Sequence, residues 1–148
     1  MWALLSNPDA HVATYAHMGH RDIEVRRAEV GDDVVEITIV RRVDVAVPAI
    51  ARRFVQPANT VTSADRWERR ADGSIAGRSE LTIAGLPVRA VGRAEIVDED
   101  GGCHYRIDLE MTTSVPVVGH RVAGAMRGQL QRQLEAQLDA AEAVLADG

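Results

Sequence analysis

The side chains best suited to chemistry are five histidines, one cysteine and a few carboxylates, and their spacing decides what they could do. His17 and His20 flank Gly19, where a helix should end, so no fixed helical spacing holds them as a pair. Cys103 and His104 are neighbours in a predicted strand and point to opposite faces, which argues against a nucleophile–base pair. A structural zinc site usually takes four ligands with sulfur among them. We therefore predict no metal and no cofactor.

Asp65 is the carboxylate that the sequence pattern places on an apolar strand face. Alternation puts it beside Ser63 and on the same side as Trp67. A buried carboxylate is costly unless it is paired or neutralised, so Asp65 could serve as a general acid or base, or as the polar anchor of a ligand. With Ser63 or Ser79 it is the weak candidate for catalysis. A one-residue bulge would instead turn Asp65 to the solvated rim.

Helical elements are expected at the start of the chain. Residues 1–6 resemble one helical turn, and Asn7 followed by Pro8 and Asp9 is typical of a helix start, because it offers a capping side chain, a proline at the first turn and an anion near the helix dipole. We expect this second helix to end near Gly19. Its predicted inward-facing residues are Val12, Tyr15 and Ala16.

Hydrophobic alternation with a period of two predicts six strands joined largely by tight turns, which is typical of an antiparallel meander. Pro48 and its neighbours suggest one or two helical turns at 47–54. The predicted strands cover residues 23–30, 35–39, 61–70, 75–83, 88–97 and 105–115.

Residues 116–145 carry apolar side chains about every four positions, which predicts one long amphipathic helix. This helix is the apolar stripe long enough to cover the inner face of the sheet, while arginines and acidic residues alternate onto an exposed, salt-bridged outer face. The fold class is therefore α+β, with one domain at 1–148. The inward-facing helical series is Val118, Val122, Met126, Leu130, Leu134, Leu138, Ala141 and Leu145.

The middle of the inner face carries small residues, and so does the start of the long helix, at Gly119, Ala123, Gly124 and Gly128. Two interpretations stay open: close packing of helix and sheet backbones, or a cavity that takes an apolar guest. The candidate ligand-binding residues are Ser63, Asp65, Trp67, Gly77, Ser79, Ala90, Gly92, Tyr105, Leu109, Met111, Val122 and Met126.

Charge and composition narrow the function classes. The formal net charge is −5, and no basic cluster of the kind that binds nucleic acid is present. The single cysteine cannot form an internal disulfide, which favours a reducing compartment. The first apolar run is too short for a signal peptide or a membrane span. We therefore expect a cytoplasmic protein that binds no nucleic acid and does not cross a membrane.

The order of these elements resembles the helix-grip fold of the START-like (SRPBCC) superfamily. The opening Trp2–Asp9 is similar to a W-x-L-L-S-D-P-x stretch in many members, and 113–119 with Gln129–Leu134 is similar to a START-like branch of unknown function. The resemblance implies non-catalytic binding or transport of a small hydrophobic ligand, lipid or polyketide-like, between sheet and helix. Alternatives are a protein-interaction module with a filled core, or a cyclase- or dehydratase-type enzyme that uses Asp65.

The sequence departs from that superfamily at its start. Members begin with a strand that pairs beside the last strand, whereas this sequence begins at the first helix. Either the true start lies upstream of Met1, or the strand 105–115 has an uncovered edge. An uncovered edge invites pairing with another chain, which predicts a homodimer through this strand.

Overall fold

The computed structural model describes residues 1–44, 58–85, 88–113 and 119–146. Its elements confirm the predicted order of two short helices, six strands and a long helix. The predicted helical turns at 47–54 lie outside the described residues. The elements are α1 (Trp2–Leu5), α2 (Pro8–His17), β1 (Arg21–Val30), β2 (Val34–Asp44), β3 (Ala58–Arg69), β4 (Ile75–Ile83), β5 (Val88–Glu99), β6 (Gly102–Thr113) and α3 (Gly119–Ala146).

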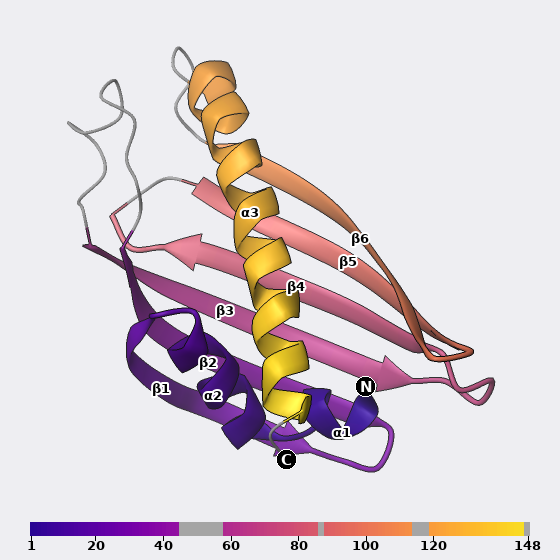
Figure 1. Cartoon of the computed structure of the whole chain (residues 1–148). Coiled ribbons are helices and arrows are strands. Elements are labelled where there is room, and N and C mark those ends of the chain that lie inside the picture. The colour runs from indigo at the N-terminus through magenta and orange to yellow at the C-terminus, as the bar shows by residue number, and fades with distance from the viewer. Residues whose placement is uncertain (45–57, 86–87, 114–118, 147–148) are drawn as a thin grey trace.

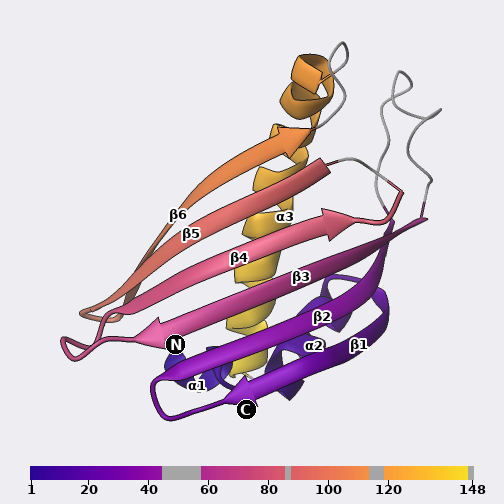
Figure 2. The same cartoon turned by 180° about the vertical axis from the view of Figure 1, so that it is seen from behind.

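The six strands form one antiparallel sheet in the order of the sequence, from β1 to β6, and so confirm the predicted meander and the α+β class. Figure 1 shows α3 lying obliquely across one face of this curved sheet, with α1 and α2 on the same side. The opposite face, seen in Figure 2, carries none of these helices. The molecule therefore has one helical layer on one sheet layer.

Side chains alternate between the two sheet faces as predicted. In β2, Val35, Ile37 and Ile39 are almost completely buried on the helix side, and Ile96 of β5 is equally buried. One group of core residues joins Leu4 and Leu5 of α1 to Trp67 and Ile96. A second group, Tyr15 with Val35, Ile37 and Ile39, forms under α2.

Helix α2 begins as its sequence predicts. The Asn7 side chain accepts a hydrogen bond from the Asp9 backbone N–H at 3.0 Å, and the chain leaves the helix through Gly19 at a φ of +78°. Tyr15 is buried as predicted, but the prediction for Ala16 is wrong, because Ala16 is exposed. The buried positions are His11, Thr14 and Tyr15, whose spacing of three and four is that of one helix face.

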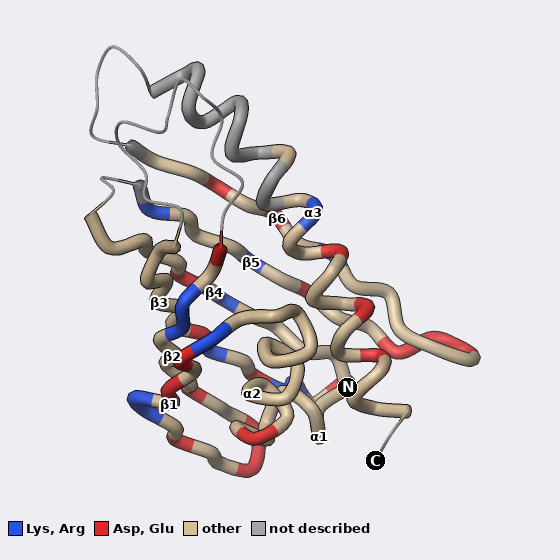
Figure 3. The backbone as a smooth tube through the Cα atoms, turned by 60° about the vertical axis from the view of Figure 1, so that its left-hand side comes forward, with Lys and Arg blue, Asp and Glu red and all other residues tan. Residues whose placement is uncertain are grey.

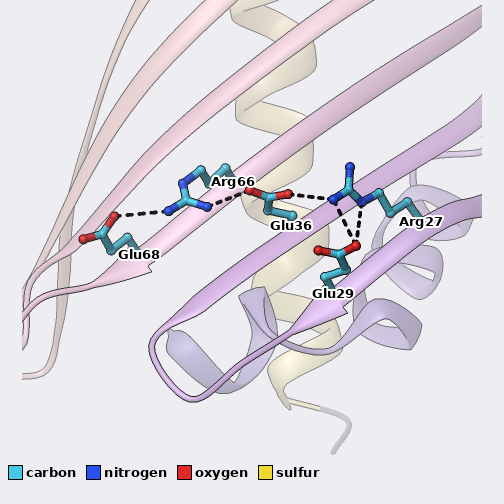
Figure 4. Close-up of polar contacts among 5 residues, drawn as sticks. All are labelled: Arg27, Glu29, Glu36, Arg66 and Glu68. Atoms are coloured by element: carbon cyan, nitrogen blue, oxygen red, sulfur yellow. Dashed lines mark hydrogen bonds and ion pairs between the residues drawn. The ribbon is translucent and has the colours of Figure 1, made fainter.

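The outer face carries charges of both signs, which are interspersed along the strands in Figure 3. Figure 4 shows one row of ion pairs that crosses β3, β2 and β1. Arg66 contacts Glu36 at 2.6 Å and Glu68 at 3.7 Å, while Arg27 contacts Glu36 at 3.3 Å and Glu29 at 2.9 Å. These side chains are largely exposed, so each pair stabilises by less than about 1 kcal/mol. The predicted outer surface is confirmed here.

Helix α3 departs from its predicted face near its end. Leu145 was predicted to point inward, yet it is 50% exposed, whereas Ala140 and Ala141 are buried. Positions four apart advance about 40° beyond a full turn at each step, so a series that begins at Val118 cannot keep one face to the end. On the same helix, Gln133 and Gln137 are half-buried.

Candidate functional site

A cavity of about 200 Å³ lies between the sheet and its helices. Helix α3 packs on α2 at one end and approaches the sheet at β6, so it bridges the concave face above β3, β4 and β5 (Figure 1). Small residues of β4 and β5, namely Ser79, Ala90 and Gly92, line the space beneath the helix. The cavity walls come from α1, α2, all strands except β1, and the second half of α3.

The register of the sheet brings several of the predicted site residues into two neighbouring rows across the inner face. One row runs from Ile37 through Asp65, Ser79 and Gly92 to Leu109. The next row is Ile39, Ser63, Leu81, Ala90 and Met111. Paired positions of antiparallel strands hold their side chains side by side, so residues far apart in the sequence share one wall.

The structure places most of the predicted ligand-binding residues on this wall. Gly77 is not part of the wall, because the Trp67 ring covers it: a Cβ atom at Gly77 would lie 2.2 Å from a Trp67 ring carbon. Met111 is half-buried on its row but does not line the cavity, and the side chains of Val122 and Met126 lie outside the described part. The predicted residues on the wall are Ser63, Asp65, Trp67, Ser79, Ala90, Gly92, Tyr105 and Leu109.

Several polar wall residues were missed from the sequence. Arg41 continues the inward alternation of Val35, Ile37 and Ile39, and its side chain is buried, so the prediction that the arginines form only the outer surface is wrong. This signal was present in the strand pattern. The burial of His11 and His20, by contrast, depends on how α2 packs against the sheet. The polar wall residues outside the prediction are His11, Thr14, Tyr15, His20, Arg41, Glu80, Gln133 and Gln137.

Arg41 is the first member of a stack of three side chains, in which Tyr15 lies at the centre. Its Nη1 donates a hydrogen bond to Ser63 Oγ at 2.7 Å, and its Cζ lies 3.8 Å from the centroid of the Tyr15 ring. The Tyr15 ring in turn stacks on His20, with centroids 5.6 Å apart. A guanidinium over an aromatic face gains cation–π attraction, which is strongest away from water. Helix α2 and β2 thus fix each other through this stack.

Asp65 is buried, with 9% exposure, so the alternative that places it at the solvated rim is wrong. Burial raises the pKa of its carboxyl group, while hydrogen bonding with Ser79 and the positive charges of His11 and Arg41 act in the opposite direction. A raised pKa favours a neutral carboxylic acid that can donate a proton or a hydrogen bond.

The neighbouring titratable groups also favour their neutral forms. Burial raises the pKa of Tyr15 and, together with the charge of Asp65, raises the pKa of Tyr105 to about 12. Burial and the adjacent Arg41 lower the pKa of His20. Burial thus acts against the charged form of each of these groups, and the cationic side chain beside Tyr15 is Arg41.

A family of proteins of unknown function (DUF2505) has a sequence model that matches residues 1–145. The chain belongs to this family. The match includes both short helices, the whole sheet and nearly all of α3, so the cavity of this DUF2505 chain lies entirely within the matched region. None of the curated proteins matches the sequence.

Three buried polar atoms of the DUF2505 cavity have no hydrogen-bond partner among the described residues: Arg41 Nε, His20 Nδ1 and Trp67 Nε1. Arg41 and His20 belong to the stack on α2, and Trp67 lies farther along the wall. Buried polar atoms are nearly always hydrogen-bonded, to protein or to water. Arg41 Nε and Trp67 Nε1 are N–H donors, so both are suited to a molecule that supplies acceptors.

The described residues of this DUF2505 chain contain no group of three or more histidine, cysteine or acidic side chains that could hold a metal ion. Within the same residues, no helix combines the length and the apolar character that crossing a bilayer would take.

Proposed function

We propose that this DUF2505 chain binds a small, largely apolar molecule, lipid or polyketide-like, in the cavity between the sheet and α3, as a carrier or sensor without catalysis. The main support for this proposal is the cavity itself. Its apolar lining includes Leu4, Leu5, Ile96 and Tyr105. Space in a core costs stability, and a molecule that fills it would recover the lost contacts. Ligand sites are typically concave and mostly apolar, with a few placed polar groups.

The arrangement of layers supports the same proposal. A curved antiparallel sheet with a long C-terminal helix across its concave face is what the START-like resemblance implies, and we propose that the fold is of this helix-grip type. In that superfamily the apolar ligand occupies the space between helix and sheet. The analogy supports the location of the ligand and leaves its chemistry to the residues of this chain.

The proposal is tested by native mass spectrometry of freshly purified protein, compared with the mass of the denatured chain. We expect an excess mass that denaturation releases, and organic extraction would then identify the molecule. Ala90 lines the cavity and is 4% exposed, so Ala90→Phe should fill the space and remove the excess mass.

Ala64→Phe is the matched control, because Ala64 is exposed on β3 and should keep the ligand. Equal masses of the native and denatured protein, together with no binding of added apolar molecules, would reject the proposal. A filled protein-interaction module would give the same negative result, and a stable complex in pull-downs would then support that alternative.

The burial of Asp65 favours a second candidate, an enzyme of the cyclase or dehydratase type. Its carboxyl group, with a raised pKa, hydrogen-bonds with Ser79 and lies close enough to Tyr105 to raise the pKa of the phenol. Such a group could act as a general acid. Asp65→Asn should then abolish turnover of the extracted molecule while binding persists, and unchanged turnover would exclude this role.

A further inference from the structure

The cavity has a polar end and an apolar end. Arg41, Tyr15 and His20 stack together beside α2, and Gln133 and Gln137 of α3 hydrogen-bond with His20 and Tyr15 respectively. Leu4, Leu5, Ile96 and Ala141 belong to one apolar group around Trp67 and also line the cavity. A molecule that fills both ends must itself have one polar end.

The polar end holds a cation without a paired anion. Arg41 is only 5% exposed, and no carboxylate of the described residues lies within 4.0 Å of its guanidinium. Ser63 takes one of its N–H groups, and Nε has no acceptor among the described residues. A buried charge is costly unless it is paired.

Asp65 is the nearby acidic group that could serve as a counter-ion, and two observations limit this role. Asp65 is opposite Ile37 in the register, four positions along β3 from Val61, the register partner of Arg41. Burial also raises the pKa of Asp65, which favours its uncharged form. The guanidinium is thus left available for an anion from outside the chain.

We propose that the ligand of this cavity is a small amphipathic carboxylate, with its carboxylate at Arg41 and its apolar body beside Trp67, Leu5 and Ile96. Arginine presents its N–H groups in a planar fork that matches a carboxylate. A cavity of about 200 Å³ has room for on the order of ten non-hydrogen atoms, because a cavity of about 150 Å³ holds one benzene ring. This inference rests on the proposed function and specifies its ligand class.

The test compares two probes of equal shape, octanoate and octanamide, by isothermal titration calorimetry at neutral pH. Wild-type protein, freed of bound molecules, should bind octanoate about ten- to a hundredfold more tightly, because hydrogen bonds to a charged partner are the stronger ones. Arg41→Met keeps most of the apolar stem of the side chain and removes its charge, so it should abolish this preference. Arg93→Met, on the exposed face of β5, is the matched control and should keep the preference.

Each outcome decides between the two proposals. Equal binding of both probes by the wild type would overturn the inference that the ligand carries a carboxylate. The proposed function, binding of an apolar molecule in the cavity, would then still stand. A preference that persists in Arg41→Met would overturn the role of Arg41. Binding of neither probe would overturn this inference, and the mass measurement above then decides the proposed function separately. Thermal unfolding of each variant shows whether it is folded, and the wild-type comparison does not depend on any variant.

Discussion

At the scale of single residues, the inner face of the sheet is unusual in burying ionisable groups beside an open space. Arg41 and Asp65 are at most 9% exposed, although both occur in strands whose alternation is otherwise apolar on that side. Replacing buried ionic groups with apolar residues often leaves a protein equally or more stable. We therefore propose that their burial serves the proposed ligand rather than the stability of the fold.

The raised pKa of Asp65 has a consequence for stability that can be measured. Below the ordinary aspartate pKa, the folded and unfolded chains both hold the proton. As pH rises, the unfolded chain ionises first, so wild-type protein loses stability that Asp65→Asn retains. Urea unfolding at about pH 4 and about pH 7 measures this effect. The free energy of unfolding of Asp65→Asn, relative to that of the wild type, should be higher at about pH 7 than at about pH 4.

Asp108→Asn serves as the control for that experiment, because Asp108 is largely exposed and its replacement should show no such trend. If the free energies of unfolding of Asp65→Asn and wild type differ by the same amount at both pH values, burial does not raise the pKa of Asp65 in the folded protein.

Gly77 is required by the ring of Trp67. A Cβ atom there would lie 2.2 Å from the ring, and the ring is itself buried against α1 and α3. Gly77→Ala should therefore destabilise the fold by roughly 1–3 kcal/mol, as overpacking does. Gly102→Ala, whose Cβ meets nothing within 4 Å, should change the free energy of unfolding by less than about 0.5 kcal/mol. Denaturant unfolding measures both, and equal stabilities would show that Trp67 can move aside.

At the scale of elements, α2 is a short helix that closes the polar end of the cavity. Its buried face presents His11 and Tyr15 to the sheet, and His11 Nε2 donates to the Leu5 carbonyl at 2.9 Å. An isolated helix of ten residues is marginal in water. Its position therefore depends on its cap and on its packing against β1 and α3.

The cap of α2 can be tested without touching the cavity. Asn7→Ala removes the acceptor for the Asp9 N–H and should cost about 1 kcal/mol of unfolding free energy. Asn7→Ser should restore most of that loss, because serine caps helices about as well as asparagine. Thermal and denaturant unfolding report the effect. If the Ala and Ser variants are equally unstable, the side chain has a role other than capping.

At the scale of the whole molecule, the sheet has an open order with β1 and β6 at its two edges. Strand edges carry unpaired backbone groups that can pair with another chain. Leu109 of β6 is 46% exposed, which adds apolar area beside this edge. The homodimer predicted from the sequence would form through β6, which is an edge strand of the sheet.

Sedimentation velocity over a range of protein concentrations tests that prediction. We expect a dimer whose share grows with concentration, and hydrogen exchange should then slow at the outer amides of β6 while those of β1 stay unchanged. A monomer at every concentration would contradict pairing through this edge.

The sequence pattern was most reliable where local chemistry decides the structure. Turn residues and strict alternation predicted all six strands, and Asn7 with Pro8 predicted the start of α2. The same reasoning placed Asp65 on the inner face but left open whether a bulge turned it outward, because one inserted residue reverses a strand face. Arg41 was overlooked because a charged side chain is normally assigned to solvent, although its position in the strand favoured the inside.

By itself the sequence determined the fold class, the order of the strands and the two faces of the sheet, since these follow from periodicity and turn chemistry within short stretches of chain. Tertiary structure alone decided that a cavity remains above β3–β5, that Trp67 takes the space over Gly77, and that Arg41, Tyr15 and His20 stack at one end. Such features depend on the distance and angle between packed layers. They arise from contacts between residues that no local pattern links.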